Sequence, residues 1–308
     1  MKTNDESPIV CGTDFSAAAI EAVDIAAAIA RRLQSRIVLV HVDESYGMAA
    51  VDSDLFDPAV AHGRPELNRI ADRLRESGTD VEERVLCGSA FDKLVAVATK
   101  SRARLIVVGA VGHSLVRRLL VGSVAERTAE TSPVPTLVLR PGGKLLSWIQ
   151  GKRGLKVLVG YDFSPASDAA LDWVSKLRKI GKCQTTVLYS NWPPDEARRL
   201  GYEGPLPLVA NPAQIQKNLE RDLRKRVAAF LPEQEATAIV EPGWGNPEGY
   251  LFEMANGQHV DLIVVGTHQR RGLGGILLGS VSRGVLHHAR MSVAVIPPVE
   301  NIIRKSTK

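Results

Sequence analysis

The chain has 308 residues, of which 44% are hydrophobic and 24% are charged, and its formal net charge is +5. This length and composition predict two globular domains, each large enough to bury its own core. The charge excess is too slight to indicate a nucleic-acid partner. No apolar run approaches the ~20 residues of a membrane span, and the N-terminus lacks the apolar core of a signal peptide. The three cysteines are widely scattered, which fits neither a metal site nor a disulfide framework, so we expect a cytoplasmic protein.

The first half of the chain alternates short apolar runs with amphipathic stretches. The runs are typical of strands buried on both faces of a sheet. They occur at residues 8–12, 36–42, 105–108 and 136–139, with a weaker alternating run at 81–86. Helices are predicted at 16–34, 64–77 and 90–101, and from Ser123 to just before Pro133. A βαβα order of this kind predicts a parallel sheet with helices on both faces.

The second half repeats this order. Strands are predicted near 156–160, 184–190, 236–240, 262–265 and 293–296, and helices near 165–179, 212–230, 247–257 and 280–289. Between the halves lies a glycine-interrupted stretch in which Trp148 is expected to pack against one domain. We therefore divide the chain into domain 1 (1–142), a linker (143–153) and domain 2 (154–300).

The two halves also share sequence, which indicates a duplicated unit. Residues 9–16, IVCGTDFS, correspond to residues 157–164, VLVGYDFS, and the two aspartates, Asp14 and Asp162, lie 148 positions apart. The apolar run that ends at Gly109 corresponds to the one that ends at Gly266, 157 positions later. The second copy thus carries nine extra residues (157 minus 148), which we assign to its proline-rich stretch between Asn191 and Pro212.

A phosphate site is predicted after the fourth strand of the first copy. In an open parallel sheet, ligands bind beyond the carboxyl ends of the strands, where the strand order reverses. Asp14 follows the first strand, and Gly109 and Gly112 follow the fourth. After nine intervening residues come Gly122 and Ser123, which begin a helix. Glycine lets backbone N–H groups approach an anion, and a helix N-terminus favours phosphate.

This pattern of Gly-x-x-Gly, nine residues and Gly-Ser, paired with an aspartate after the first strand, resembles the ATP-binding signature of universal stress proteins. The resemblance covers nearly the whole chain as two family units in tandem. It implies a doubly wound parallel sheet of strand order 3-2-1-4-5 in each domain, as in adenine nucleotide alpha hydrolases. It also implies that Asp14 and Val42 line the adenine and ribose pocket, that Gly109, Gly112, Gly122 and Ser123 hold ribose and phosphates, and that Mg²⁺ or Mn²⁺ accompanies the ATP.

The second copy keeps Asp162, Gly266, Gly279 and Ser280 but has Gln269 where the first has Gly112. A side chain at that position is expected to obstruct the phosphate loop. The first copy is therefore predicted to be the better ATP site.

Three functions stay open at this stage. The resemblance favours a regulatory module of the stress response that binds ATP, since no general base is evident beside the phosphates and no catalytic or metal-ligating residue is assigned. A slow metal-dependent ATPase, with Asp14 and a metal orienting water, is the alternative of a different class. Gln269 favours the third, a protein-binding scaffold with degenerate sites. Asp14 and Asp162 also suit plain helix caps.

Assembly is expected as well. By resemblance, strands 136–139 and 293–296 lie at sheet edges and pair with each other, so that the two halves form a built-in dimer. Two such chains are predicted to join as a homodimer, and an unidentified regulatory protein is a further expected partner.

Overall fold

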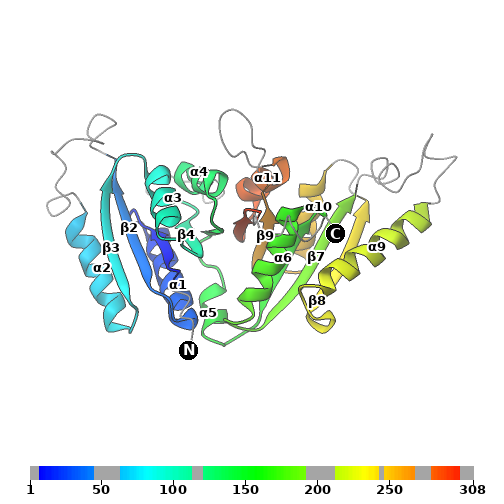
Figure 1. Ribbon diagram of the computed structural model, residues 1–308, viewed down its shortest axis with the longest axis horizontal. Helices are drawn as coiled ribbons and strands as arrows, with labels where there is room; N and C mark the ends of the chain where they lie inside the picture. The colour runs from blue at the N-terminus through cyan, green and yellow to red at the C-terminus, as the bar shows by residue number, and fades with distance from the viewer. Residues whose placement is uncertain are drawn as a thin grey trace.

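The computed structural model describes residues 7–44, 63–112, 121–191, 212–242, 246–267 and 279–298 (Figure 1). In the first half, five parallel strands form a sheet of order β3-β2-β1-β4-β5. They are β1 (Ile9–Gly12), β2 (Ile37–Asp43), β3 (Val81–Cys87), β4 (Leu105–Gly109) and β5 (Thr136–Leu139). The helices between them are α1 (Ala17–Leu33), α2 (Arg64–Glu76), α3 (Ala90–Lys100) and α4 (Ser123–Thr131).

The second half repeats the topology as β8-β7-β6-β9-β10. Its strands are β6 (Leu155–Tyr161), β7 (Cys183–Asn191), β8 (Ala236–Pro242), β9 (Leu262–Gly266) and β10 (Ser292–Ile296). Its helices are α6 (Pro165–Leu177), α9 (Pro212–Ala228), α10 (Pro247–Gly257) and α11 (Ser280–His288), with the short 3₁₀ turn η2 (Glu233–Glu235) before β8. The predicted fold class and the order 3-2-1-4-5 are confirmed.

One antiparallel pair joins the halves into a single ten-stranded sheet. β5 pairs with β10, with Leu137 opposite Ala294 at the centre of the short ladder. The expected pairing of the two last strands is therefore confirmed. It leaves β3 and β8 as the outer strands of the sheet.

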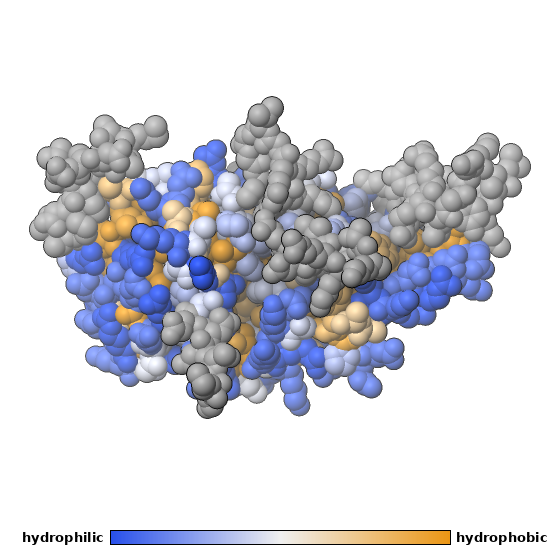
Figure 2. All heavy atoms as spheres, in the orientation of Figure 1, coloured by the Kyte–Doolittle hydropathy of each residue, from blue (hydrophilic) through white to orange (hydrophobic). Residues whose placement is uncertain are grey.

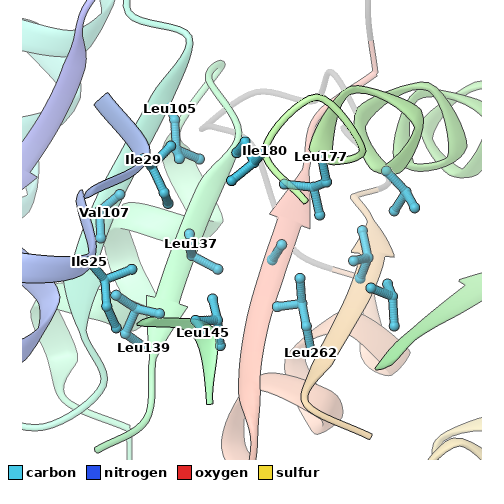
Figure 3. Packing of buried hydrophobic residues seen from close by; sticks show 14 of the residues in the cluster. Ile25, Ile29, Leu105, Val107, Leu137, Leu139, Leu145, Leu177, Ile180 and Leu262 are labelled. Atoms are coloured by element: carbon cyan, nitrogen blue, oxygen red, sulfur yellow. The ribbon is translucent and has the colours of Figure 1, made fainter. Parts of the chain in front are cut away.

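The sheet carries a hydrophobic layer on each face, and both layers run across the junction. One layer includes buried residues of α1, α2, α6 and α9, and the other includes buried residues of α3, α4, α10 and α11. Figure 3 shows part of the first layer, where Leu137 of β5 and Leu262 of β9 belong to the same cluster. The halves thus share their cores instead of touching only at the surface. Figure 2 shows that the exposed sides of α2 and α9 are mostly hydrophilic.

The linker contains a helix that the sequence did not predict. α5 (Leu145–Ile149) lies between Gly142 and Gly151, which both have positive φ angles and therefore suit glycine. Trp148 on α5 is 1% exposed, as its expected packing requires, and its Nε1 donates to the carbonyl of Lys182 in the second half at 3.0 Å. The linker is thus part of the core. No helix in the described residues is long and apolar enough to cross a membrane.

Candidate functional site

The two aspartates that follow the first strand of each half bind the turn ahead of the next helix. Asp14 Oδ1 accepts from the Ser16 backbone N–H at 3.0 Å and from its hydroxyl at 2.6 Å, and Ser16 in turn caps α1. Asp162 Oδ1 accepts from the Ser164 N–H at 3.0 Å. Both carboxylates are exposed. The N-cap residues themselves are Ser16 and Ser164, so the aspartates hold the turn ahead of each helix and are not its caps.

Gly112 lies against Asp14, as the predicted crevice requires. A Cβ atom built on Gly112 would stand 2.5 Å from Asp14 Oδ2, so a side chain there would require this carboxylate to shift. The loop after β4 and the turn after β1 therefore meet at one edge of the sheet. The equivalent of Gly112 in the second half, Gln269, lies outside the described residues.

The first glycine of each loop has a packing role that the sequence did not indicate. A Cβ on Gly266 would lie 2.6 Å from the carbonyl carbon of Ala166 on α6, and one on Gly109 would lie 3.2 Å from that of Ala18 on α1. Neither neighbour is the end of a flexible side chain. These glycines let the first helix of each half lie close against the loop.

The Gly-Ser pairs begin α4 and α11 as predicted. Gly122 and Gly279 are the N-cap residues, and among the described residues no side chain caps either helix. Ser123 and Ser280 are exposed. Because the first N–H groups of a helix have no partner within it, each start offers donors to an anion. The Gly122 N–H itself donates to the carbonyl of Ala110 at 2.7 Å, so it holds the helix start against the loop after β4.

Val42 is only partly buried, near the end of β2, where it packs on the layer beneath α3 and α4. Its counterpart in the second half is Ser190. Val40 of β2 pairs with Gly12 of β1, and Leu188 of β7 pairs with Gly160 of β6, so Val42 and Ser190 each lie two residues beyond the equivalent pair. The two halves therefore differ at the position predicted to face the base.

A cavity of about 930 Å³ lies at the predicted edge of the second half. All four site residues predicted for that half line it: Asp162, Gly266, Gly279 and Ser280. The structure thus brings together residues from the ends of β6 and β9 and the start of α11. The prediction that the first half holds the better site stays a prediction, although this cavity is in the second.

Ser190 and Thr267 also line this cavity, and sequence analysis missed both. Within the described part of the chain, Ser190 Oγ and Thr267 Oγ1 are buried without a hydrogen-bond partner. Buried hydroxyls without a partner are costly in a folded protein, so these two fit groups that a polar ligand would satisfy. The offset between the two copies, applied to Val42, would have pointed to Ser190.

A buried polar cluster lies beside the cavity. Tyr161 lines the cavity, and its hydroxyl donates to Asp168 Oδ1 on α6 at 2.6 Å. Arg226 of α9 donates to both oxygens of the same carboxylate. Burial, followed by the bond to Asp168, raises the pKa of Tyr161 well above its ordinary value. The cluster fixes α6 and α9 relative to β6, which ends one residue before Asp162.

The described residues contain no group of three or more His, Cys, Asp or Glu side chains that could hold a metal ion.

Comparison with known proteins places these features in a family. The model of the universal stress protein family matches residues 7–140 and again residues 155–297. The chain is 30% identical over 213 residues to a universal stress protein of Mycobacterium tuberculosis (strain ATCC 25618 / H37Rv), a match that covers 65% of this chain and 63% of that protein. The chain thus spans less than two thirds of the length of that relative.

A universal stress protein of Mycolicibacterium smegmatis matches at 28% identity over 97% of this chain and 99% of its own length. Among solved structures, a universal stress protein from Archaeoglobus fulgidus DSM 4304 has a TM-score of 0.65 at 18% identity, covering 97% of this chain and 100% of that one, which shows the shared fold. The chain belongs to the universal stress protein family, with two family units in tandem.

Proposed function

We propose that this protein is a regulatory module that binds an adenine nucleotide, ATP, in the cavity of its second half and at the equivalent edge of its first half. The observation that carries this proposal is the cavity itself. It joins a helix N-terminus without a side-chain cap, at Gly279 and Ser280, to the partnerless buried hydroxyls of Ser190 and Thr267. A volume of about 930 Å³ is within the range of small-molecule sites.

The parts of the cavity suit different parts of a nucleotide. The first turn of α11 offers N–H donors and the positive end of a helix dipole, which favour phosphates. Ser282 Oγ donates to the Gly266 carbonyl at 2.7 Å and so holds that helix start beside the glycine loop. Asp162 and Ser190, at the ends of neighbouring strands, suit the hydroxyls of the ribose and the polar edge of the base. The choice of adenine rests on the resemblance of the glycine–serine pattern to the family signature.

The first half offers an equivalent arrangement, in which Asp14 and Val42 would contact ribose and base and Gly109, Gly112, Gly122 and Ser123 would hold the phosphates. Mg²⁺ or Mn²⁺ would neutralise phosphate charge when bound with the nucleotide. The domain limits 1–142 and 154–300 enter this proposal as the two binding units. Cytoplasmic location and a homodimer of tandem chains complete it.

Isothermal titration with MgATP tests the proposal and assigns the sites. Ser280→Asp puts a carboxylate where the phosphates would lie, at a helix position that favours an acidic residue, so the fold should survive. We expect ATP affinity of the second site to fall by at least about tenfold, because like charges in contact cost more than about 1.4 kcal/mol. Ser123→Asp is the matched variant for the first site. Absence of ATP binding by the wild-type protein would refute the proposal.

Turnover separates this function from its alternatives. A slow ATPase would show a metal-dependent rate that Asp14→Ala or Asp162→Ala abolishes while binding persists. A scaffold with degenerate sites would bind no nucleotide in either half. The regulatory module should bind ATP, and turnover should stay at background.

A further inference from the structure

The two halves meet through a pair of helices as well as through β5 and β10. α4 and α11 lie on either side of the junction (Figure 1), and two polar contacts connect them. Glu126 Oε1 accepts from His287 Nε2 at 2.7 Å. Glu130 Oε1 accepts from Arg283, at 2.8 Å from Nη2 and 3.1 Å from Nε. Each contact joins residues more than 150 positions apart in the chain.

The contacts are reciprocal in terms of the internal repeat. With the offset of 157 that aligns Gly122 with Gly279, Glu126 corresponds to Arg283, and Glu130 corresponds to His287. The first position of each helix, Glu126 or Arg283, therefore contacts the second position of the other helix, His287 or Glu130. The strands agree, because Leu137 and Ala294 are equivalent by the same offset and lie opposite each other in the ladder. The junction thus has the pattern of a two-fold interface between two units.

The side chains at these equivalent positions differ in kind. The first half carries two carboxylates, and the second carries a guanidinium and an imidazole, which here donate. Two copies of the first half in this geometry would place Glu126 opposite Glu130 twice. Two copies of the second would place Arg283 opposite His287 twice, with no carboxylate to accept from either. Only the pairing of unlike halves satisfies both contacts.

A third contact also depends on the difference between the halves. Arg140, which follows β5, is 6% exposed, and its Nη2 donates to the carbonyl of Leu286 near the end of α11 at 3.3 Å. A cation there is favoured by the helix dipole. The position equivalent to Arg140 in the second half is Pro297, which has no donor to offer α4.

We propose that α4 and α11 form a charge-coded recognition surface that selects the unlike half as its partner and disfavours pairing of either half with its own kind in a second chain. Within one chain, the partner is the chain's own second half. The buried linker helix α5 supports this, since its Trp148 bonds directly to the carbonyl of Lys182. Arg283 also lines the cavity of the second half, so the test below is made without nucleotide.

Hydrogen exchange of β5 and β10, measured by mass spectrometry on the full-length protein without nucleotide, tests the proposal. The double variant Arg283→Glu, His287→Glu gives both helices the same charge. We expect the amides of both strands to exchange about tenfold faster, because two favourable contacts become repulsive. Adding Glu126→Arg and Glu130→His restores the pairs in exchanged order and should return exchange to within about threefold of wild type.

A matched control is Arg224→Glu on α9, which reverses the charge in an exposed pair with Glu220 away from the junction. It should leave exchange in β5 and β10 unchanged. The proposal is overturned if the double variant exchanges like wild type, or if the fourfold variant exchanges as fast as the double variant. Sedimentation of Arg283→Glu, His287→Glu adds a second readout, since a first half released from its partner should not pair with another first half.

Discussion

Tyr161 shows at the scale of one residue how the site is held. The side chain is 4% exposed, and its hydroxyl donates to a carboxylate, Asp168, that Arg226 also binds. Tyr161, which ends β6 one residue before Asp162, therefore satisfies a buried acceptor on α6. Phe163, the next residue, has a positive φ of 60° and packs edge-on against Tyr161. These contacts fix the backbone that presents the second predicted aspartate to the cavity.

The raised pKa of Tyr161 gives this bond a pH dependence. A group whose pKa is higher in the folded than in the unfolded state stabilises the fold below its unfolded value, about 10, and loses that contribution as the pH rises further. We expect Tyr161→Phe to cost about 1.5–3 kcal/mol at pH 7, the value of a hydrogen bond to a charged acceptor. Above pH 10 the wild type should lose stability faster than the variant, so the gap should narrow.

Urea unfolding of both proteins at pH 7, 9 and 10.5 measures this difference. A gap that stays constant between pH 9 and 10.5 would contradict the assigned bond, because phenylalanine does not titrate. The groups other than Tyr161 titrate in both proteins and cancel in the comparison.

The candidate site was predictable at this scale only in part. Asp14 and Gly109 were expected to open onto one crevice if the first and fourth strands were neighbours, and β1 does pair with β4. Gly112 lies there too, since a Cβ on it would stand 2.5 Å from Asp14 Oδ2. Thr267 was missed because a buried hydroxyl without a partner leaves no signature in sequence, whereas Ser190 could have been found from the repeat as the counterpart of Val42. The packing of Gly266 on Ala166 was missed for a similar reason, since glycine spacing alone does not distinguish an anion loop from a close helix approach.

At the scale of elements, the sequence predicted the strands and helices well because both signals are strong. Buried parallel strands are continuous apolar runs, and the helices between them are long and amphipathic. α5 was missed because a helix of five residues is too short for periodicity, and tertiary contacts, not intrinsic propensity, hold such a segment. Its apolar sequence Leu145–Ile149 was the available signal.

α5 should therefore matter to stability more than a linker would. Trp148→Ala removes a side chain that is 1% exposed and leaves the Lys182 carbonyl without its indole donor. We expect a loss of about 3–5 kcal/mol in the free energy of unfolding, as for other buried aromatic truncations. Trp148→Phe, the control, keeps most of the packing and should cost less. Urea unfolding measures both, and a loss below about 1 kcal/mol for Trp148→Ala would mean that α5 is a passive connection.

At the scale of the whole molecule, the duplicated units form one folded body around a single sheet and are not two separate domains joined by a linker. The sequence predicted the two units and, by resemblance, the pairing of their last strands. The sequence did not predict the shared core, because the layer in which Leu137, Leu145 and Leu262 pack together is formed by contacts between distant segments (Figure 3). The complementary side chains of α4 and α11, carboxylates on one helix and donors on the other, could be recognised in the sequence only once the structure showed which positions face each other.

A shared core predicts cooperative unfolding of the two halves. Both hydrophobic layers cross the junction, so unfolding one half exposes apolar surface of the other and lowers its stability. We expect a single calorimetric transition whose van't Hoff enthalpy equals the calorimetric enthalpy, which is the test of two-state behaviour. The double variant Arg283→Glu, His287→Glu weakens the junction without touching either layer, so its transition should broaden or split. Two resolved transitions in the wild-type protein would show that each half is stable alone, and that the contacts across β5 and β10 contribute little to either.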